Sequence, residues 1–360
     1  MTIPIQDTDR SSLSYCHDFD CGSNSTSEEW HQIMSDELKT PLTSIQNALK
    51  ILHSGQFSSF SQTGQRLLDI ALKNTRRLVR LSQALENQAA TSIACLSPTH
   101  VGRLQLENEL EAALHHQELQ LYYQPIVVFE TQELIGFEAL TRWSHPTRGW
   151  ISPNEFIPIA EATGLIDALG LWVLEQACRQ MVIWQQQFPQ ASSLTVSVNL
   201  STLQLSNPRL PEKIETLLQQ TGLAPESLRL EITESAFLDH SPVALKCLQK
   251  IKAMGILLYI DDFGTGYSSL SRLQDWPIDL IKIDNTFVRG KQWTMISAIL
   301  LLAESLNVDV IVEGVETLED LDQLQQLGCQ QGQGYLFSKP LPAQLIYAQL
   351  ACPISSPIEA

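Results

Sequence analysis

Between residues 120 and 340, short apolar segments with strand character alternate with longer segments of helical periodicity. This alternation constrains the fold most, because repeated strand–helix–strand units build a parallel sheet that helices cover. The eight strand segments in this part of the chain predict an α/β fold, a (β/α)8 TIM-like barrel. An open doubly wound sheet is the alternative, although no Gly-x-Gly-x-x-Gly follows the first strand.

The strand candidates are Gln120–Val127, Leu134–Thr141, Leu194–Leu200, Leu228–Thr233, Leu257–Ile260, Leu280–Ile283, Val308–Val312 and Gly334–Phe337. The helix candidates are Leu104–Leu119, which leads into the first strand, and Pro153–Phe188, Arg209–Thr221, Ser241–Met254, Trp293–Leu306 and Leu318–Leu327.

Polar residues occur at the ends of nearly all these strands. They are Glu138, Arg142, Asn199, Glu231, Glu234, Asp261, Asp262, Lys282, Asp284, Glu313, Glu316 and, ahead of the last strand, Gln333. Because the C-terminal strand ends of a barrel face one mouth, we expect these groups to converge. A carboxylate cluster of this size repels itself unless divalent cations neutralise it, and all-oxygen ligands favour Mg²⁺, Mn²⁺ or Ca²⁺ over zinc.

The clearest of these strand ends is the apolar run that stops at Asp261-Asp262, with Gly264 and Gly266 directly behind. On its own this stretch fits either an acidic turn or a metal site at a strand tip. The acids, the asparagine and the lysine at the other strand ends favour the metal site.

Composition limits the class of protein. Apolar residues make up 44% of the chain and charged residues 18%, which is ordinary for a globular protein. The net charge of −17 argues against binding of duplex nucleic acid. No apolar stretch is long enough for a membrane span. The seven cysteines are scattered without a Cys-x-x-Cys spacing, so we expect reduced thiols and a cytoplasmic location.

The first hundred residues differ from the rest. Residues 1–27 predict a flexible tail, and residues 28–90 contain two amphipathic helical runs joined by a Ser/Gly-rich loop. Because such a hairpin cannot bury both apolar faces alone, it predicts a homodimer with a four-helix bundle. Packing of the hairpin on its own catalytic domain is the alternative. Residues 91–103 are expected to form a linker and residues 104–350 the catalytic domain.

The segment Ser35-Asp36-Glu37-Leu38-Lys39-Thr40-Pro41-Leu42 resembles the histidine-kinase dimerisation and phosphoacceptor domain. Asp36 stands where that family has its phosphoacceptor histidine, and His31 lies outside the motif. The resemblance therefore implies the dimer scaffold without phosphotransfer. It leaves open that the hairpin docks a response regulator or a sensor protein.

The larger domain resembles the EAL-domain phosphodiesterases, which convert cyclic di-GMP to linear pGpG. The resemblance rests on eight motifs in order: Tyr123-Gln-Pro-Ile126, Glu138-Ala-Leu-Thr-Arg-Trp143, Val198-Asn-Leu-Ser201, Glu231-Ile-Thr-Glu234, Asp261-Asp-Phe-Gly-Thr-Gly-Tyr-Ser-Ser-Leu270, Lys282-Ile-Asp284, Glu313-Gly-Val-Glu316 and Gly334-Tyr-Leu-Phe-Ser-Lys-Pro340.

This resemblance implies roles for individual residues. The implied metal ligands are Glu138, Asn199, Glu231, Asp261, Asp262 and Glu313. Lys282 matches the lysine beside the attacking water, and Gln333 matches a glutamine at the barrel mouth. Gln124 and Arg142 match substrate contacts, Glu234 the acid that holds the loop after the fifth strand, Glu316 the second acid of its motif, and Asp284 lies in the lysine motif.

The chemistry agrees with these roles. Two cations about 3.5–4 Å apart can clamp a phosphodiester and activate a water, and Asp261 stands where it would bridge them. Lys282 would stabilise developing negative charge, whereas Glu313 fits the role of ligand, of general base or of both. The sequence thus predicts a phosphodiesterase that depends on two Mg²⁺ or Mn²⁺ ions and is regulated through its N-terminal dimerisation module. A non-catalytic cyclic di-GMP receptor or a response-regulator-docking protein are the alternatives.

Overall fold

The computed structural model describes residues 98–351, apart from 115, 238–241, 266–272 and 274–275, and also Ile45. The predicted tail and helical hairpin, with His31 and Asp36, therefore lie outside the described residues. The chain divides into two compact units, Met1–Leu96 and Ser97–Ala360, and the elements described here belong to the second unit. No helix in the described part of the chain is long and apolar enough to cross a membrane.

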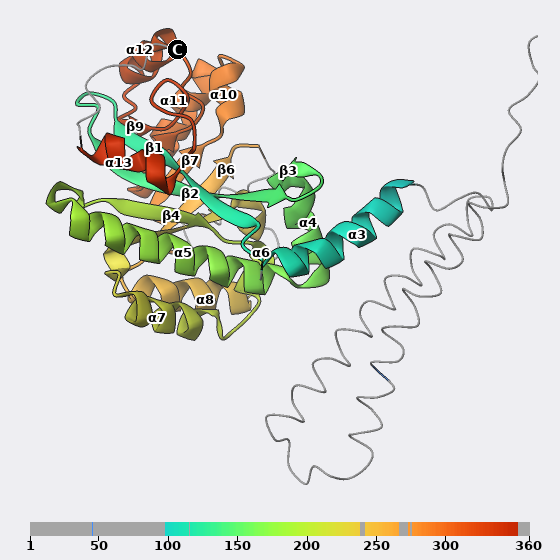
Figure 1. The fold of residues 1–360 in the computed structure, drawn as a ribbon. Helices are drawn as coiled ribbons and strands as arrows, with labels where there is room; N and C mark the ends of the chain where they lie inside the picture. Colours follow the sequence, from blue (N-terminus) through green and yellow to red (C-terminus); the bar gives the residue numbers. More distant parts are fainter. Residues whose placement is uncertain are drawn as a thin grey trace, which may run out of the picture. The chain divides into compact units, whose positions relative to one another are not determined.

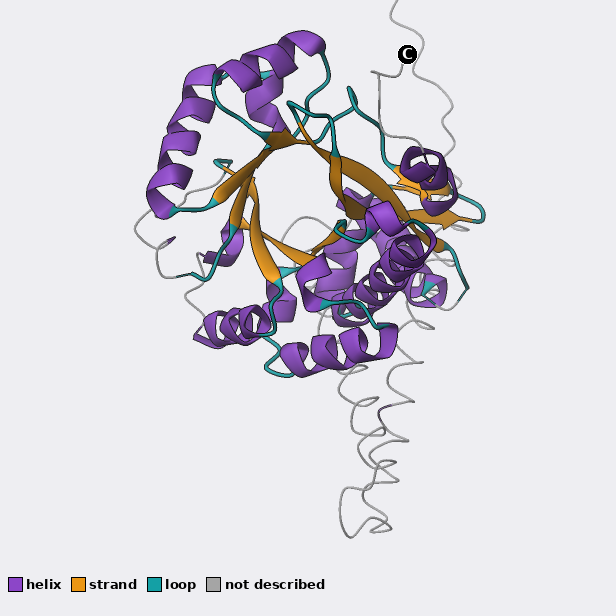
Figure 2. Ribbon diagram, turned by 90° about the vertical axis from the view of Figure 1, so that its left-hand side faces the viewer, coloured by secondary structure: helices purple, strands orange, loops and turns teal. Residues whose placement is uncertain are grey.

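Within the described residues, eight strands close into a barrel in the order β1-β9-β8-β7-β6-β5-β4-β2, and β2 pairs back to β1. Figure 2 shows these strands as a ring with the helices around it, which confirms the predicted α/β barrel. The barrel strands are β1 (Leu119–Val128), β2 (Leu134–His145), β4 (Thr195–Asn199), β5 (Leu228–Thr233), β6 (Leu257–Phe263), β7 (Leu280–Ile283), β8 (Asp309–Val312) and β9 (Gln331–Gly332).

Helices and short elements connect these strands (Figure 1). The α-helices are α3 (Pro98–Ala113), α4 (Pro153–Thr163), α5 (Ile166–Gln187), α6 (Thr202–Leu205), α7 (Leu210–Thr221), α8 (Pro242–Ala253), α10 (Asn285–Arg289), α11 (Trp293–Leu306), α12 (Leu318–Gln326) and α13 (Ala343–Ala351). The remaining elements are strands β3 (Gly149–Ile151) and β10 (Leu341–Pro342) and 3-10 turns at Pro189–Ala191, Pro225–Ser227 and Glu234–Phe237.

The first barrel strand departs from the regular repeat. Strand β1 pairs antiparallel with both β2 and β9, whereas the pairs from β2 through β4 to β9 are parallel. The chain passes from β1 to β2 through residues 129–133 alone, and a connection this short makes a hairpin because it cannot hold a crossover helix.

The eighth strand was predicted at the wrong place. Residues Gly334–Phe337 form a turn, in which Phe337 N–H donates to the Gly334 carbonyl over 3.1 Å, and the strand lies earlier, at Gln331–Gly332. The apolar side chains misled the assignment, because Phe337 is buried in a stack with Phe129. A Cβ at residue 334 would stand 2.1 Å from the Val315 carbonyl oxygen, so only glycine fits this turn.

Two helix predictions also need correction. The expected helix Leu104–Leu119 begins earlier, at Pro98, and ends at Ala113, so part of the expected linker 91–103 is helical. The expected single helix from 153 to 188 is split into α4 and α5 at Gly164, whose φ of 76° ends α4 in the left-handed conformation.

The barrel has two apolar layers. Inside it, Ile126, Tyr259, Leu280 and Ile311 pack together from four strands. Outside it, the outward side chains of the strands form one continuous core with the helices. This packed interior supports the floor of the polar site described next.

Candidate metal centre

The two-residue period of the strands directs polar side chains into the barrel. On β5, Leu230 and Ile232 pack in the outer core, so Glu231 between them points inward. Lys282 stands in the same way between two buried isoleucines of β7. Both side chains are 0% exposed, which is rare for charged groups unless they are paired.

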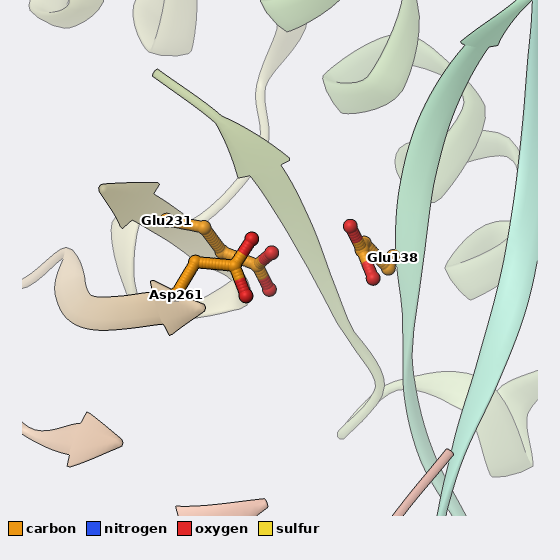
Figure 3. A group of neighbouring side chains, drawn as sticks. All are labelled: Glu138, Glu231 and Asp261. Carbon is orange, nitrogen blue, oxygen red and sulfur yellow. The ribbon is translucent and has the colours of Figure 1, made fainter. Parts of the chain in front are cut away.

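Lys282 is the centre of the polar cluster. Its Nζ lies 2.7 Å from Glu313 Oε1, 2.8 Å from Glu231 Oε2, 3.0 Å from Asp261 Oδ1 and 3.2 Å from Glu138 Oε2. Figure 3 shows Glu138 facing Glu231 and Asp261 from the other side of the barrel. The predicted convergence of these five residues is therefore present.

Two amides hold Glu138 in place. Asn199 Nδ2 donates to Glu138 Oε1 over 2.9 Å, and Gln333 Nε2 donates to Glu138 Oε2 over 2.6 Å and to Glu313 Oε1 over 3.0 Å. Since the nitrogens of both amides donate to carboxylates, the amide oxygens are the atoms that could bind a cation. The Gln333 oxygen is buried without a hydrogen-bond partner.

A bulge explains how two consecutive aspartates serve one site. In a regular strand, neighbouring side chains point to opposite faces. Here the pairing of β6 with β7 shifts register between Ile260 and Phe263, and Asp262 has a φ of 55°, in the left-handed region. As a result, carboxylate oxygens of Asp261, Asp262 and Glu313 lie within 4.8 Å of one another.

The acids of the cluster cannot all be ionised beside one lysine. Burial and the nearby Asp261 carboxylate raise the pKa of Glu313 to about 8 despite Lys282. Burial also raises the pKa of Glu231 and of Asp261, and together with the Asp261 charge it raises the pKa of Asp262 to about 6.

The other two members are held in their charged forms. Although burial opposes ionisation, the Lys282 charge and the hydrogen bonds of Gln333 and Asn199 lower the pKa of Glu138. The pKa of Lys282 is raised in spite of its burial, because Asp261 and Glu138 stand against it.

The cluster fits divalent cations by its donor set. Carboxylate oxygens of Glu138, Glu231 and Asp261 also lie within 4.8 Å of one another, so Asp261 belongs to two overlapping ligand groups. Glu231 Oε1 is buried without a hydrogen-bond partner. All-oxygen groups with this excess of negative charge match the preference of Mg²⁺ and Mn²⁺.

A groove adjoins the cluster on the side of β2 and β4. It has a volume of about 710 Å³, and its lining includes Arg142, Asn199 and Thr233. The Arg142 guanidinium lies 5.9 Å from the centroid of the Tyr122 ring and donates to the Thr141 carbonyl. Gln124, the other predicted substrate contact, is buried, and its Nε2 lies 3.5 Å from the Ser338 carbonyl oxygen.

The remaining predicted residues stand around the cluster. Glu234 Oε2 accepts from the backbone N–H of Gly264 over 2.9 Å, which ties down the chain after β6. Asp284 caps α10 by accepting from Thr286 N–H over 3.0 Å. Glu316 forms a surface ion pair with Arg289, in which Glu316 Oε1 lies 2.9 Å from Arg289 Nη2, and it takes no part in the central cluster.

No role was predicted for Glu161, Ser201 or Gln204, which line the same groove, although Ser201 ends one of the eight motifs. Ser201 Oγ donates to Glu161 Oε1 over 2.7 Å and also caps α6. The Ser-x-x-Gln spacing of a capping box was readable in the sequence. The partner on α4 was not, because it lies forty residues away along the chain.

Comparison with known proteins gives two family matches and several relatives. The EAL domain model matches residues 107–340, and the His Kinase A (phospho-acceptor) domain model matches residues 28–88. The bifunctional diguanylate cyclase/cyclic di-GMP phosphodiesterase MucR of Pseudomonas aeruginosa is 41% identical over 254 residues, which cover 69% of this chain and 37% of MucR.

A second relative and a solved structure extend this picture. The cyclic di-GMP phosphodiesterase NbdA of the same organism is 36% identical over 317 residues, 86% of this chain and 40% of NbdA. The structure of the PaMucR phosphodiesterase in its c-di-GMP complex superposes with a TM-score of 0.64 at 40% identity, over 67% of this chain and 99% of that one. The chain spans about a third of the length of four of the curated relatives that it matches.

Proposed function

The chain belongs to the EAL-domain family, and on this basis we propose that its barrel hydrolyses cyclic di-GMP to linear pGpG with two divalent cations, Mg²⁺ or Mn²⁺. The observation that carries the proposal is the convergence of Glu138, Glu231, Asp261 and Glu313 on one buried lysine. Such a surplus of buried negative charge is stable only with protons or cations in it.

The residues proposed to hold the cations are Glu138, Asn199, Glu231, Asp261, Asp262 and Glu313. Asp261 is the proposed bridge, since its carboxylate belongs to both groups of neighbouring ligands. Bound there, divalent cations supply the positive charge that a phosphodiester needs and lower the pKa of the attacking water.

The chain's own residues complete the chemistry. We assign to Lys282 the orientation of the nucleophile and the stabilisation of negative charge, because its position inside the cluster is fixed by four carboxylates. Gln333 would fix the rotamers of Glu138 and Glu313, to which it donates. Glu313, a proposed ligand, is also the candidate for a general base, because burial and the Asp261 charge raise its pKa.

The groove beside the cluster is the proposed binding place for the rest of the dinucleotide. Arg142 can donate to two phosphate oxygens at once, and Gln124 adds an amide at the β1 wall. Glu234 would keep the end of β6 in position through Gly264, Asp284 would fix the chain after Lys282, and Glu316 would do so after Glu313.

For the N-terminal region we propose a dimerisation module that regulates the barrel in the cytoplasm, possible partners being a response regulator or a sensor protein. The match of residues 28–88 to the phospho-acceptor domain supports this proposal.

The test is direct. The purified chain is mixed with cyclic di-GMP and Mg²⁺ or Mn²⁺, and the nucleotides are separated by chromatography. Formation of pGpG that stops when the metal is chelated is the expected result. Tight binding of cyclic di-GMP without any pGpG would contradict the proposal and would favour a receptor.

A further inference from the structure

The turn that follows β4 is held by two helices from outside the cluster. Asn199 is the last residue of β4, and two residues later Ser201 is the N-cap of the four-residue helix α6. The Asn199 backbone is paired with Glu231 of β5, and Leu200 N–H donates to the Glu231 carbonyl over 2.8 Å, whereas the pairing of β4 with β2 ends one residue earlier, at Val198. On the β2 side, the position of Asn199 therefore depends on how the Ser201 turn is fixed.

The hydroxyl of Ser201 makes two hydrogen bonds. It accepts from Leu203 N–H over 3.3 Å as the cap of α6, and it donates to Glu161 Oε1 over 2.7 Å. The capping box is closed by Ser201 N–H, which donates to Gln204 Oε1 over 3.1 Å. Since a hydroxyl has one proton, Glu161 is the acceptor that decides its direction.

Glu161 occupies an unfavourable place on its own helix. It lies in the last turn of α4, where the helix dipole disfavours negative charge. Its carboxylate is directed away from α4, to the turn behind Asn199. The hydrogen bond to Ser201 gives this carboxylate a partner outside its own helix.

Helix α5 is shaped for the same turn. Gln204 is 1% exposed, and a Cβ added to Gly170 of α5 would lie only 2.1 Å from Gln204 Nε2. Helix α4 therefore supplies a carboxylate that binds the Ser201–Gln204 turn, and the glycine of α5 leaves the space into which the Gln204 side chain packs.

We propose that Glu161 is a positioning residue for Asn199, acting through the Ser201 hydroxyl. It thereby sets the affinity for the cation that Asn199 helps to bind. The inference rests on the proposed function for the identity of the ligand set. Asn199 itself is oriented by the bond from its Nδ2 to Glu138, so a shift of the turn would move its oxygen relative to the other ligands.

The test measures Mn²⁺ binding to the full chain by calorimetry, without any substrate. Glu161→Ala removes the acceptor. Ser201→Gly removes the hydroxyl while keeping a residue that helix N-termini tolerate. We expect each to weaken Mn²⁺ binding about tenfold or more, as loss of a group that orients a metal ligand typically does. The double variant should bind Mn²⁺ no more weakly than the weaker-binding single variant, because both substitutions remove the same hydrogen bond.

Conservative changes and a control separate positioning from general damage. Glu161→Gln keeps an acceptor and Ser201→Thr keeps a hydroxyl, so both should bind Mn²⁺ nearly as tightly as the unaltered chain. Glu155→Ala changes an exposed glutamate on the same helix and should have no effect. In turnover assays the Mn²⁺ concentration for half activity should rise in Glu161→Ala, while kcat at saturating Mn²⁺ recovers.

Unchanged Mn²⁺ affinity in Glu161→Ala or Ser201→Gly would overturn the proposal, and so would an equal loss in Glu161→Gln. If Glu161→Ala does not fold, as judged by circular dichroism, Ser201→Gly alone decides. Failure of the proposed function is distinguishable, because a chain that binds Mn²⁺ but forms no pGpG still reports on Glu161.

Discussion

Replacing Lys282 by methionine tests the charge balance of the cluster most directly. Methionine keeps most of the side-chain length and removes the ammonium group that faces Glu138, Glu231, Asp261 and Glu313. Without a cation, the four acids then have to take up protons or repel one another in a buried place.

The expected loss follows from the burial. Lys282 is 0% exposed, so the ion pairs that it forms are shielded from water. Removing one partner of a buried pair typically costs about 3–5 kcal/mol. For a domain of this size, each kcal/mol lowers Tm by roughly 2–4 °C, so the variant should melt roughly 6–20 °C lower in the presence of a chelator.

Metal should restore much of this stability. A cation that binds only the folded state adds about 2.7 kcal/mol at a hundred times its Kd. In Lys282→Met no ammonium group competes with the cation for the same carboxylates, so the Tm of this variant should rise more on addition of Mn²⁺ than that of the unaltered chain. Turnover of cyclic di-GMP should still fall by about 100-fold or more, the usual effect of losing a group that stabilises developing charge.

The assay is thermal unfolding by circular dichroism with chelator and with Mn²⁺, followed by product formation. Lys246→Met, which alters an exposed lysine of α8, is the matched control and should melt like the unaltered chain. A chelator Tm for Lys282→Met within about 2 °C of the control, a change worth less than about 1 kcal/mol, would refute the charge argument. Turnover near that of the control would refute the catalytic assignment.

Three further predictions concern the ligands, the loop and the N-terminal region. Glu138→Gln keeps the shape of the side chain but should lower turnover about 100-fold and weaken Mn²⁺ binding measured by calorimetry. The control Glu130→Gln, at an exposed glutamate, should change neither. A fully active Glu138→Gln variant would exclude Glu138 as a metal ligand. Gly264→Ala should lower the free energy of unfolding, measured in urea, by about 1–3 kcal/mol. The reason is that residue 264 has a φ of 96° and the new Cβ would lie 2.7 Å from Phe287 Cζ. Unchanged stability would show that the loop adapts. Deleting residues 1–96 should shift the mass measured by light scattering from dimer toward monomer, and an unchanged dimer would show that the barrel alone carries the contact.

The inward residues of regular strands were predictable from sequence. Glu231 and Lys282 each stand between apolar neighbours in a short run, and a period of two leaves one direction for them. The same rule does not reach residues outside regular strands. Asp262 should have pointed away from Asp261, and only the bulge after Ile260 brings it to the cluster.

Other differences have the same local origin. Short apolar runs such as Gly334–Phe337 satisfy the strand pattern, but the close approach of Gly334 to Val315 turns the chain there. The contact between Glu161 and Ser201 joins two elements that no sequence period connects. Tertiary packing decides such places, and local preference has little weight there.

The candidate ligands differ in how firmly the fold holds them. Glu138 and Glu231 lie within paired strands, so neighbouring strands fix their backbone on both sides. Asn199 is the last paired residue of β4 and Asp262 lies in the bulge of β6, and behind each stands one carboxylate, Glu161 through Ser201 and Glu234 through Gly264. Because α3 packs on α4, the helix that carries Glu161, movements of α3 would reach the ligand at the end of β4 before those inside the strands. Regulation of the metal centre from outside the barrel is therefore expected to act on the strand-end ligands and to leave the mid-strand acids in place.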